Sequence, residues 1–135
     1  MTSSDDASTT GLLDTSVFVA LEAGRELDVE RLPFEAAVSI VTIAELRVGV
    51  LMASDPAARA SRLSTYTRAL EFDPITIDET VAAAWADLRL RLAVAKRRMT
   101  GNDSWIAATA IAHGIPVVTQ DDDFIEGLGY EVIRI

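Results

Sequence analysis

Four acidic residues stand where a metal-binding site could form: Asp14, Glu45, Asp103 and Asp121. Each follows an apolar, strand-like run or begins a helix-like segment. Carboxylate oxygens are the ligands that Mg²⁺ and Mn²⁺ prefer, and Mg²⁺ usually takes only a few of them while it keeps several waters. An ion held by such a cluster can polarise a phosphoryl oxygen and activate water for in-line attack. The four acids therefore form a candidate site for phosphoryl chemistry.

Each acid also has a purely structural explanation, which is the commoner one for a single residue. Asp14 could cap a helix, and Glu45 follows Thr42 at the spacing of a capping box. Asp103 suits the dipole at a helix start, and Asp121–Asp123 could form a solvated loop with a cap. The joint placement of four acids at one expected edge of the fold favours a shared site.

The elements that must position these acids follow from the apolar periodicity. Short strand-like runs alternate with longer helical ones along the chain. We expect strands at 11–13, 36–41, 116–119 and 131–135, an extended segment at 72–77, helices at 17–23, 43–52, 56–70, 79–95 and 104–113, and a helical turn at 123–128. Asp78 is the expected N-cap of the helix at 79–95, and Gly114 is expected to end the helix at 104–113.

Strands that alternate with helices predict a mostly parallel sheet with helices on both faces, which is a three-layer α/β/α sandwich. We assign residues 11–135 to a single domain, and residues 1–10, which are polar and acidic, to a disordered lead-in. In such folds ligands bind beyond the carboxyl ends of the strands. The four acids are expected at that edge.

Composition limits the classes of function. The formal net charge is −9, from 21 acidic and 12 basic residues, which argues against nucleic-acid binding by basic residues alone unless a divalent cation inverts the local charge. The chain has no cysteine and therefore no thiolate site. No apolar run approaches the ~20 residues of a membrane-spanning helix, and we expect a cytoplasmic protein without membrane contact.

Four short motifs carry the candidate acids in order along the chain. They are Leu13-Asp14-Thr15-Ser16, Thr42-Ile-Ala-Glu45-Leu46, Asn102-Asp103-Ser-Trp-Ile-Ala-Ala108 and Thr119-Gln-Asp121-Asp-Asp-Phe124. Together they resemble the motifs of PIN-domain nucleases, with the VapC toxins of bacterial toxin–antitoxin modules as the best match. The resemblance extends from about Leu12 to Ile135.

This resemblance implies an endoribonuclease that depends on Mg²⁺, or on Mn²⁺. It implies Asp14, Glu45, Asp103 and Asp121 as the catalytic acids, with Asp14, Asp103 and Asp121 as metal ligands and Ser16, Asn102 and Asp123 in support. Asp123 competes with Asp121 as fourth acid. We prefer Asp121 because it directly follows a predicted strand, whereas Asp123 resembles a helix cap. The resemblance also implies a tRNA or rRNA loop as substrate, products with 5′-phosphate and 3′-hydroxyl ends, a cognate antitoxin and a homodimer.

A single basic run, Lys96-Arg97-Arg98, lies shortly before Asn102 and Asp103. Cations are favoured at a helix C-terminus, and a phosphate contact is an equally supported explanation of the run.

Three other functions were weighed. A haloacid-dehalogenase-like phosphatase needs a second Asp two residues after the first, where this chain has Ser16. A phospho-receiver domain needs paired acids after the first strand and a late lysine, but Lys96 is the only lysine. A protein-interaction module whose acids bind no metal is the third alternative.

Overall fold

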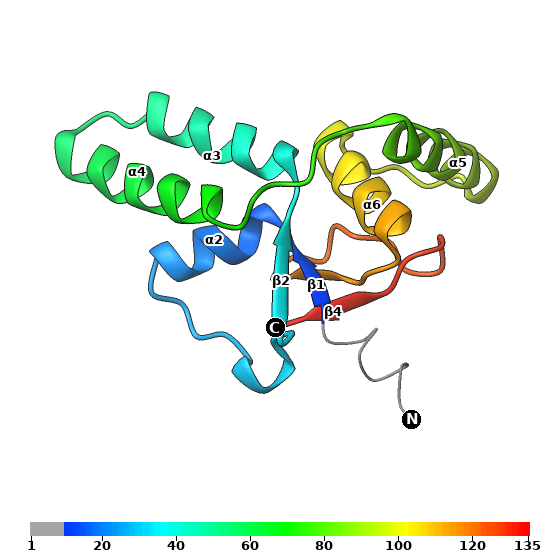
Figure 1. Ribbon diagram of the computed structural model, residues 1–135, viewed down its shortest axis with the longest axis horizontal. Coiled ribbons are helices and arrows are strands. Elements are labelled where there is room, and N and C mark those ends of the chain that lie inside the picture. The colour runs from blue at the N-terminus through cyan, green and yellow to red at the C-terminus, as the bar shows by residue number, and fades with distance from the viewer. Residues whose placement is uncertain (1–9) are drawn as a thin grey trace.

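Four short parallel strands form the centre of the computed structural model, which describes residues 10–135 (Figure 1). They are β1 (Thr10–Leu13), β2 (Glu35–Val38), β3 (Val117–Thr119) and β4 (Val132–Arg134). The strands lie in the order β2-β1-β3-β4, and every neighbouring pair is parallel. The predicted parallel sheet is therefore confirmed.

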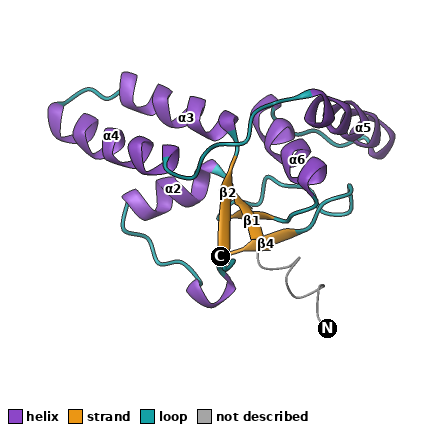
Figure 2. Ribbon diagram, viewed as in Figure 1, coloured by secondary structure: helices purple, strands orange, loops and turns teal. Residues whose placement is uncertain are grey.

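The helices cover both faces of this sheet (Figure 2). They are α2 (Thr15–Glu22), α3 (Ile40–Leu51), α4 (Pro56–Leu70), α5 (Glu79–Ala95) and α6 (Gly101–His113), with a short 3₁₀ helix η1 (Val29–Arg31). Helices α2, α3 and α4 gather on one side of the sheet, and α5 and α6 on the other.

The two faces of β1 show why the chain folds into three layers. Successive strand residues point to opposite faces, so Leu12 joins a buried cluster that contains Leu88 of α5 and Ile106 of α6. Leu13 joins a second cluster that contains Phe18 of α2 and other residues of α2, α3 and α4. Burial of both faces explains the continuous apolar run of this strand, and the predicted α/β/α sandwich is confirmed.

Two predicted helix ends are confirmed. The side chain of Asp78 accepts a hydrogen bond from the Val81 N–H at 2.9 Å and caps α5. Gly114 ends α6 with φ of 63°, a left-handed conformation that glycine adopts without strain.

The start of α3 was predicted wrongly. The strand expected over 36–41 ends at Val38, and α3 begins at Ile40. Ser39 is the N-cap, since its side chain accepts a hydrogen bond from the Val41 N–H at 3.1 Å. The capping box proposed for Thr42 and Glu45 does not exist because both residues lie inside the helix.

The helical turn expected at 123–128 is also absent, and this segment forms only turns and bends. Gly127 and Gly129 have φ values of 85° and 102°, which a right-handed helix does not allow. Phe124 is buried and packs edge-on against Tyr130 with ring centroids 6.5 Å apart. The expected lead-in over 1–10 falls almost wholly outside the described residues, since β1 begins at Thr10.

The strand order places a topological switch at β1. The chain leaves β1 for β2 on one side, and later returns to β3 on the other side. Ligands of open α/β sheets bind beyond the carboxyl ends of the strands at such a switch. Asp14 directly follows β1, and Asp121 follows β3 by two residues. Between residues 10 and 135, no helix is long and apolar enough to cross a membrane.

Candidate active site

A hollow of about 380 Å³ brings the candidate acids together at the carboxyl edge of the sheet. We call it the acidic pocket. Its lining comprises Asp14, Thr15, Ser16, Val19, Arg25, Glu45, Thr100, Asp103, Asp121 and Asp123. The prediction that four acids from distant parts of the chain meet at one edge agrees with this geometry.

Asp14 is the most buried acid of the acidic pocket, with 2% of its surface exposed. Burial, with a smaller contribution from the charge of Asp121, raises its pKa from 3.8 to about 6 against the lowering effect of the hydrogen bonds from Ser16 and Thr119. Asp14 is the N-cap residue of α2, but its side chain makes no capping hydrogen bond. The Val17 N–H still lowers the pKa of Asp14, but capping alone does not account for an aspartate this deeply buried.

Two hydroxyl groups hold the Asp14 carboxylate in place. Ser16 Oγ donates to Asp14 Oδ1 at 2.6 Å, and Thr119 Oγ1 donates to Oδ2 at 2.8 Å. Ser16 Oγ also accepts the Gln120 N–H at 2.9 Å, and Thr119 Oγ1 accepts the Asp121 N–H at 2.9 Å. The supporting role predicted for Ser16 fits these contacts, whereas Thr119 was not singled out from the sequence.

Glu45 is held by a different pair of side chains. Its Oε1 accepts a hydrogen bond from Thr15 Oγ1 at 2.5 Å, and its Oε2 accepts one from Asn102 Nδ2 at 3.1 Å. Asn102 was expected to support the site beside Asp103, and the structure shows that its contact is with Glu45. These bonds couple α3 to the starts of α2 and α6.

Asp103 lies in the first turn of α6, because this helix begins at Gly101, three residues before the predicted start at 104. Its N–H donates to Thr100 Oγ1 at 3.1 Å, which makes Thr100 the cap of α6. Burial raises the pKa of Asp103, and the charges of Glu45, Asp123 and Asp121 raise it further, against the Thr100 hydrogen bond.

The three consecutive aspartates after β3 have different surroundings. Asp121 and Asp123 line the acidic pocket, whereas Asp122 pairs with Arg134 at 3.1 Å. Partial burial raises the pKa of Asp121, and the neighbouring charge of Asp123 raises it further, while Arg25 lowers it. The prediction that Asp123 caps a helix is wrong, since no helix follows it. Both aspartates are therefore placed to serve as the fourth acid.

Arg25 is the one basic residue that lines the acidic pocket, and no motif in the sequence indicates it. The chain turns back after α2 because Gly24 adopts a φ of 72°, and the N–H groups of Gly24 and Arg25 then donate to Leu21 and Ala20. The side chain of Arg25 forms no ion pair within residues 10–135. Its guanidinium group is available to an anionic ligand.

Other singled-out residues lie outside the acidic pocket. Lys96, Arg97 and Arg98 follow α5, and His113 ends α6. Trp85 and Trp105 stack on each other between α5 and α6, with ring centroids 4.6 Å apart and planes 9° from parallel.

The donor atoms of the acidic pocket fit a hard cation. They are all oxygens, since cysteine is absent from the sequence and His113 is not among the lining residues. Within the described part of the chain, no three acidic or histidine side chains are arranged to hold an ion directly. Mg²⁺ requires only one or two direct carboxylates and completes its shell with water. The pocket therefore suits an ion bound by some acids directly and by others through water.

The family follows from comparison with known proteins. The PIN domain pattern matches residues 11–127. This chain belongs to the PIN-domain family. Ribonuclease VapC4 of Mycobacterium tuberculosis is 54% identical to it over 125 residues, which cover 92% of this chain and 95% of the relative. Ribonuclease VapC5 of the same organism is 47% identical over 128 residues, covering 93% and 95%.

Solved structures show the same PIN fold. The crystal structure of VapBC-5, a member of the VapBC family of toxin–antitoxin systems from Mycobacterium tuberculosis, has a TM-score of 0.87 at 43% identity and covers 94% of this chain and 99% of that one. A DNA-bound VapBC from Salmonella typhimurium has a TM-score of 0.77 at 21% identity, covers 94% and 98%, and supports the fold alone. The predicted resemblance to VapC proteins is confirmed, and the phosphatase and phospho-receiver alternatives are excluded.

Proposed function

We propose that this PIN domain is a divalent-metal-dependent endoribonuclease and the toxin of a toxin–antitoxin pair. The observation that carries the proposal is the acidic pocket, which gathers four further carboxylates around the buried Asp14 at the topological switch of the sheet. The chain's similarity to proteins named VapC ribonucleases supports RNA as the substrate.

The carboxylates have distinct roles in this proposal. Asp14, Asp103 and Asp121 would hold Mg²⁺ or Mn²⁺, with Asp123 able to share the role of Asp121. The bound ion would polarise the scissile phosphate and activate water. Ser16 and Thr119 keep the Asp14 oxygens oriented. The Glu45 carboxylate is oriented by Thr15 and Asn102, and in this proposal it would accept a proton from the attacking water.

Arg25 adds a positive charge to a pocket that is otherwise lined by negatively charged side chains. A guanidinium group matches the geometry of a phosphate and can form two parallel hydrogen bonds to it. Because Arg25 has no carboxylate partner among the described residues, it is free to hold the scissile phosphate beside the acids. The expected RNA is a tRNA or rRNA loop, where unpaired bases are accessible.

A protein partner is part of the same proposal. The VapBC-5 structure is described as a toxin–antitoxin system, and we expect a cognate antitoxin for this chain. An apolar hollow of about 240 Å³ between α2 and α4, lined in part by Phe18, Leu21 and Phe72, is a surface that such a partner would cover. A homodimer and a cytoplasmic location remain predictions.

The function is tested by incubating the purified protein with total cellular RNA and Mg²⁺ or Mn²⁺. The matched proteins are Asp14→Asn and Asp87→Asn, the latter an exposed acid on α5 outside the acidic pocket. We expect discrete fragments with 5′-phosphate and 3′-hydroxyl ends, which EDTA and Asp14→Asn abolish and Asp87→Asn does not. Fragments that all carry 2′,3′-cyclic phosphates, or cleavage that persists in EDTA, would refute the mechanism. An inert protein on tRNA and rRNA alike would favour the interaction-module alternative.

A further inference from the structure

A second hollow, of about 410 Å³, lies at the C-terminal end of α5. We call it the arginine hollow. Three arginines, Arg89, Arg97 and Arg98, line it together with the apolar side chains of Leu92, Ala93 and Met99. None of these arginines forms an ion pair within residues 10–135, although the chain carries 21 acidic residues. Arg89 lies over the Trp85 ring at 5.4 Å, so its charge is in contact with an aromatic face and not with a carboxylate. Three guanidinium groups without a carboxylate partner, beside an apolar surface, point to an anionic ligand that also has an apolar part.

The loop that carries two of these arginines is held at both ends. Lys96 adopts φ of 55° and ψ of 42°, and the N–H groups of Lys96 and Arg97 donate to Ala93 and Leu92 of the last helical turn. Glycine is the usual residue in this left-handed position, so a lysine here costs backbone energy. Met99 packs against the core and accepts a hydrogen bond from Tyr130 at 3.6 Å. The basic run is therefore displayed on an ordered turn.

The same loop joins the arginine hollow to the acidic pocket. Arg98 and Met99 line the arginine hollow, and Thr100 lines the acidic pocket. Two residues of extended chain span at most about 7 Å. The arginine hollow therefore begins within about one nucleotide's length of the acidic pocket along this loop.

We propose that the arginine hollow binds a nucleotide of the RNA strand next to the cleaved bond, an inference that rests on the proposed function. The guanidinium groups would hold its phosphates, and the apolar residues would contact its base. An acidic peptide is the competing ligand. The arginine hollow adjoins the acidic pocket, where the proposed RNA substrate lies, and this continuity favours a nucleotide over a separate peptide.

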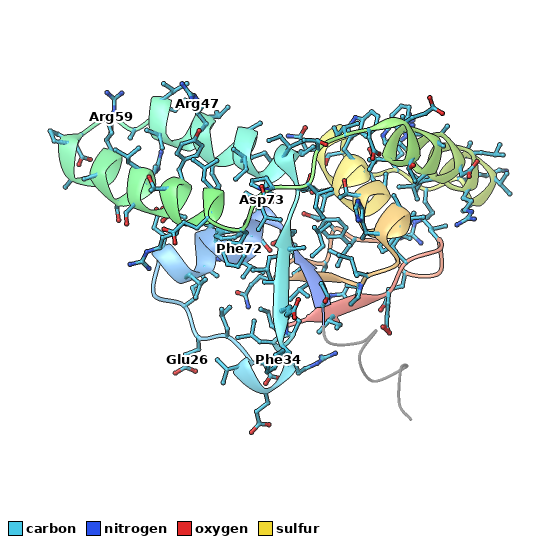
Figure 3. All side chains as sticks on the ribbon, in the orientation of Figure 1. Glu26, Phe34, Arg47, Arg59, Phe72 and Asp73 are labelled. Carbon is cyan, nitrogen blue, oxygen red and sulfur yellow. The ribbon has the colours of Figure 1, made fainter. Side chains whose placement is uncertain are left out.

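The test uses the Asp14→Asn protein, which is expected to leave RNA uncut, at a constant Mg²⁺ concentration high enough to fill its weakened metal site. Binding of a short fluorescein-labelled single-stranded RNA is followed by anisotropy at several concentrations of monovalent salt. Arg97→Ala/Arg98→Ala is compared with Arg31→Ala/Arg59→Ala, which removes two exposed arginines outside both hollows. Arg59 lies at the outer end of α4, far from the sheet (Figure 3). The control therefore matches the change in net charge.

We expect Arg97→Ala/Arg98→Ala to weaken binding at least ~10-fold and to reduce the slope of log K against log salt by about 1.4, from two lost phosphate contacts on a single strand. The control variant should retain the parent slope. An abasic site is then placed at each position of the RNA in turn. In the protein with Arg97 and Arg98 intact, the abasic site should weaken binding at a single position.

Unchanged affinity and slope in Arg97→Ala/Arg98→Ala, or an equal loss in the control, would overturn the proposal. Full binding of every abasic strand would overturn the nucleotide contact, and displacement of the RNA by oligoglutamate at equal charge concentration would favour a peptide ligand. The protein with Asp14 intact is assayed separately for RNA cleavage. If it does not cleave RNA, the proposed nuclease function fails, whereas the anisotropy measurement still tests whether the arginine hollow binds RNA.

Discussion

Thr119 donates a hydrogen bond from Oγ1 to Asp14 Oδ2 at 2.8 Å, and the bond joins the ends of β3 and β1. The same hydroxyl oxygen accepts the N–H of Asp121 at 2.9 Å. The Thr119 hydroxyl therefore holds two candidate metal ligands: Asp14 through its carboxylate and Asp121 through its backbone N–H. Supporting residues of this kind orient metal ligands and tune their affinity.

Thr119→Val should lower both metal affinity and cleavage by about 10–100-fold, because it leaves an Asp14 oxygen and the Asp121 N–H without a partner. Thr109→Val is the matched control, since Thr109 is also buried but donates to Trp105 O within α6. Calorimetric titration with Mn²⁺ and RNA cleavage rates provide the measurement. Equal effects of the two substitutions would show that Thr119 acts only on stability.

The pH dependence of stability should report the buried Asp14. Its pKa is raised from 3.8 to about 6 in the folded protein, so the native state holds this proton more tightly than the unfolded chain. Ionisation of the buried Asp14 therefore destabilises the folded protein. This loss of stability is absent below the pKa of Asp14 in the unfolded chain and complete above its pKa in the folded protein. Metal-free protein should therefore lose up to ~3 kcal/mol of unfolding free energy through Asp14 as pH rises from about 4 to about 7.

Urea unfolding in EDTA measures this contribution as the difference in unfolding free energy between Asp14→Asn and the parent protein. Asp14→Asn should be the more stable protein at neutral pH, and its advantage should shrink toward pH ~4. Asp103 and Asp121 also have raised pKa values and are present in both proteins. A difference that does not vary with pH would contradict a raised pKa for Asp14.

Arg25→Ala should reduce cleavage by roughly 100-fold, which is the lower end of the usual loss for one transition-state contact. Arg31→Ala is the control, an exposed arginine of the 3₁₀ helix η1 that does not line the acidic pocket. Single-turnover rates at saturating Mg²⁺ distinguish two roles. Unchanged cleavage together with tighter Mg²⁺ binding would mean that Arg25 only offsets the charge of the acids.

Separate substitution of the aspartates after β3 identifies the fourth acid. Asp121→Asn is expected to abolish most cleavage because the Asp121 backbone is tied to Thr119, and Asp123→Asn is expected to have the smaller effect. Asp122→Asn should leave the rate unchanged, since Asp122 pairs with Arg134. A larger loss of cleavage rate for Asp123→Asn than for Asp121→Asn would reverse the assignment.

The parts of the fold that follow periodicity were predictable from the sequence. Parallel strands place their carboxyl ends at one edge, and this rule located Asp14 and Asp121 correctly. The start of α3 was not predictable in the same way, because Ile40 and Val41 favour strands locally and the side chain of Ser39 caps a helix instead. The turn at 123–128 was misjudged because the conformations of Gly127 and Gly129 depend on the packing around Phe124 and Tyr130.

The candidate site was predictable in its acids and not in their partners. Residue type and position after a strand select Asp14 and Asp121, whereas Glu45 and Asp103 lie inside α3 and α6 and reach the pocket through the packing of these helices. The contacts of Thr119 and of Asn102 join segments far apart in the chain, and no local pattern encodes them. Arg25 depends on the left-handed turn at Gly24, which directs the chain back toward the acidic pocket.

The most direct test of this account is Mn²⁺ binding, followed by electron paramagnetic resonance of the free ion. The parent protein, Asp14→Asn and Asp87→Asn are titrated in the absence of RNA. The account predicts saturable binding by the parent and by Asp87→Asn, weakened at least ~10-fold in Asp14→Asn. Equal binding by all three proteins, or none by the parent, would contradict a divalent-metal site in the acidic pocket.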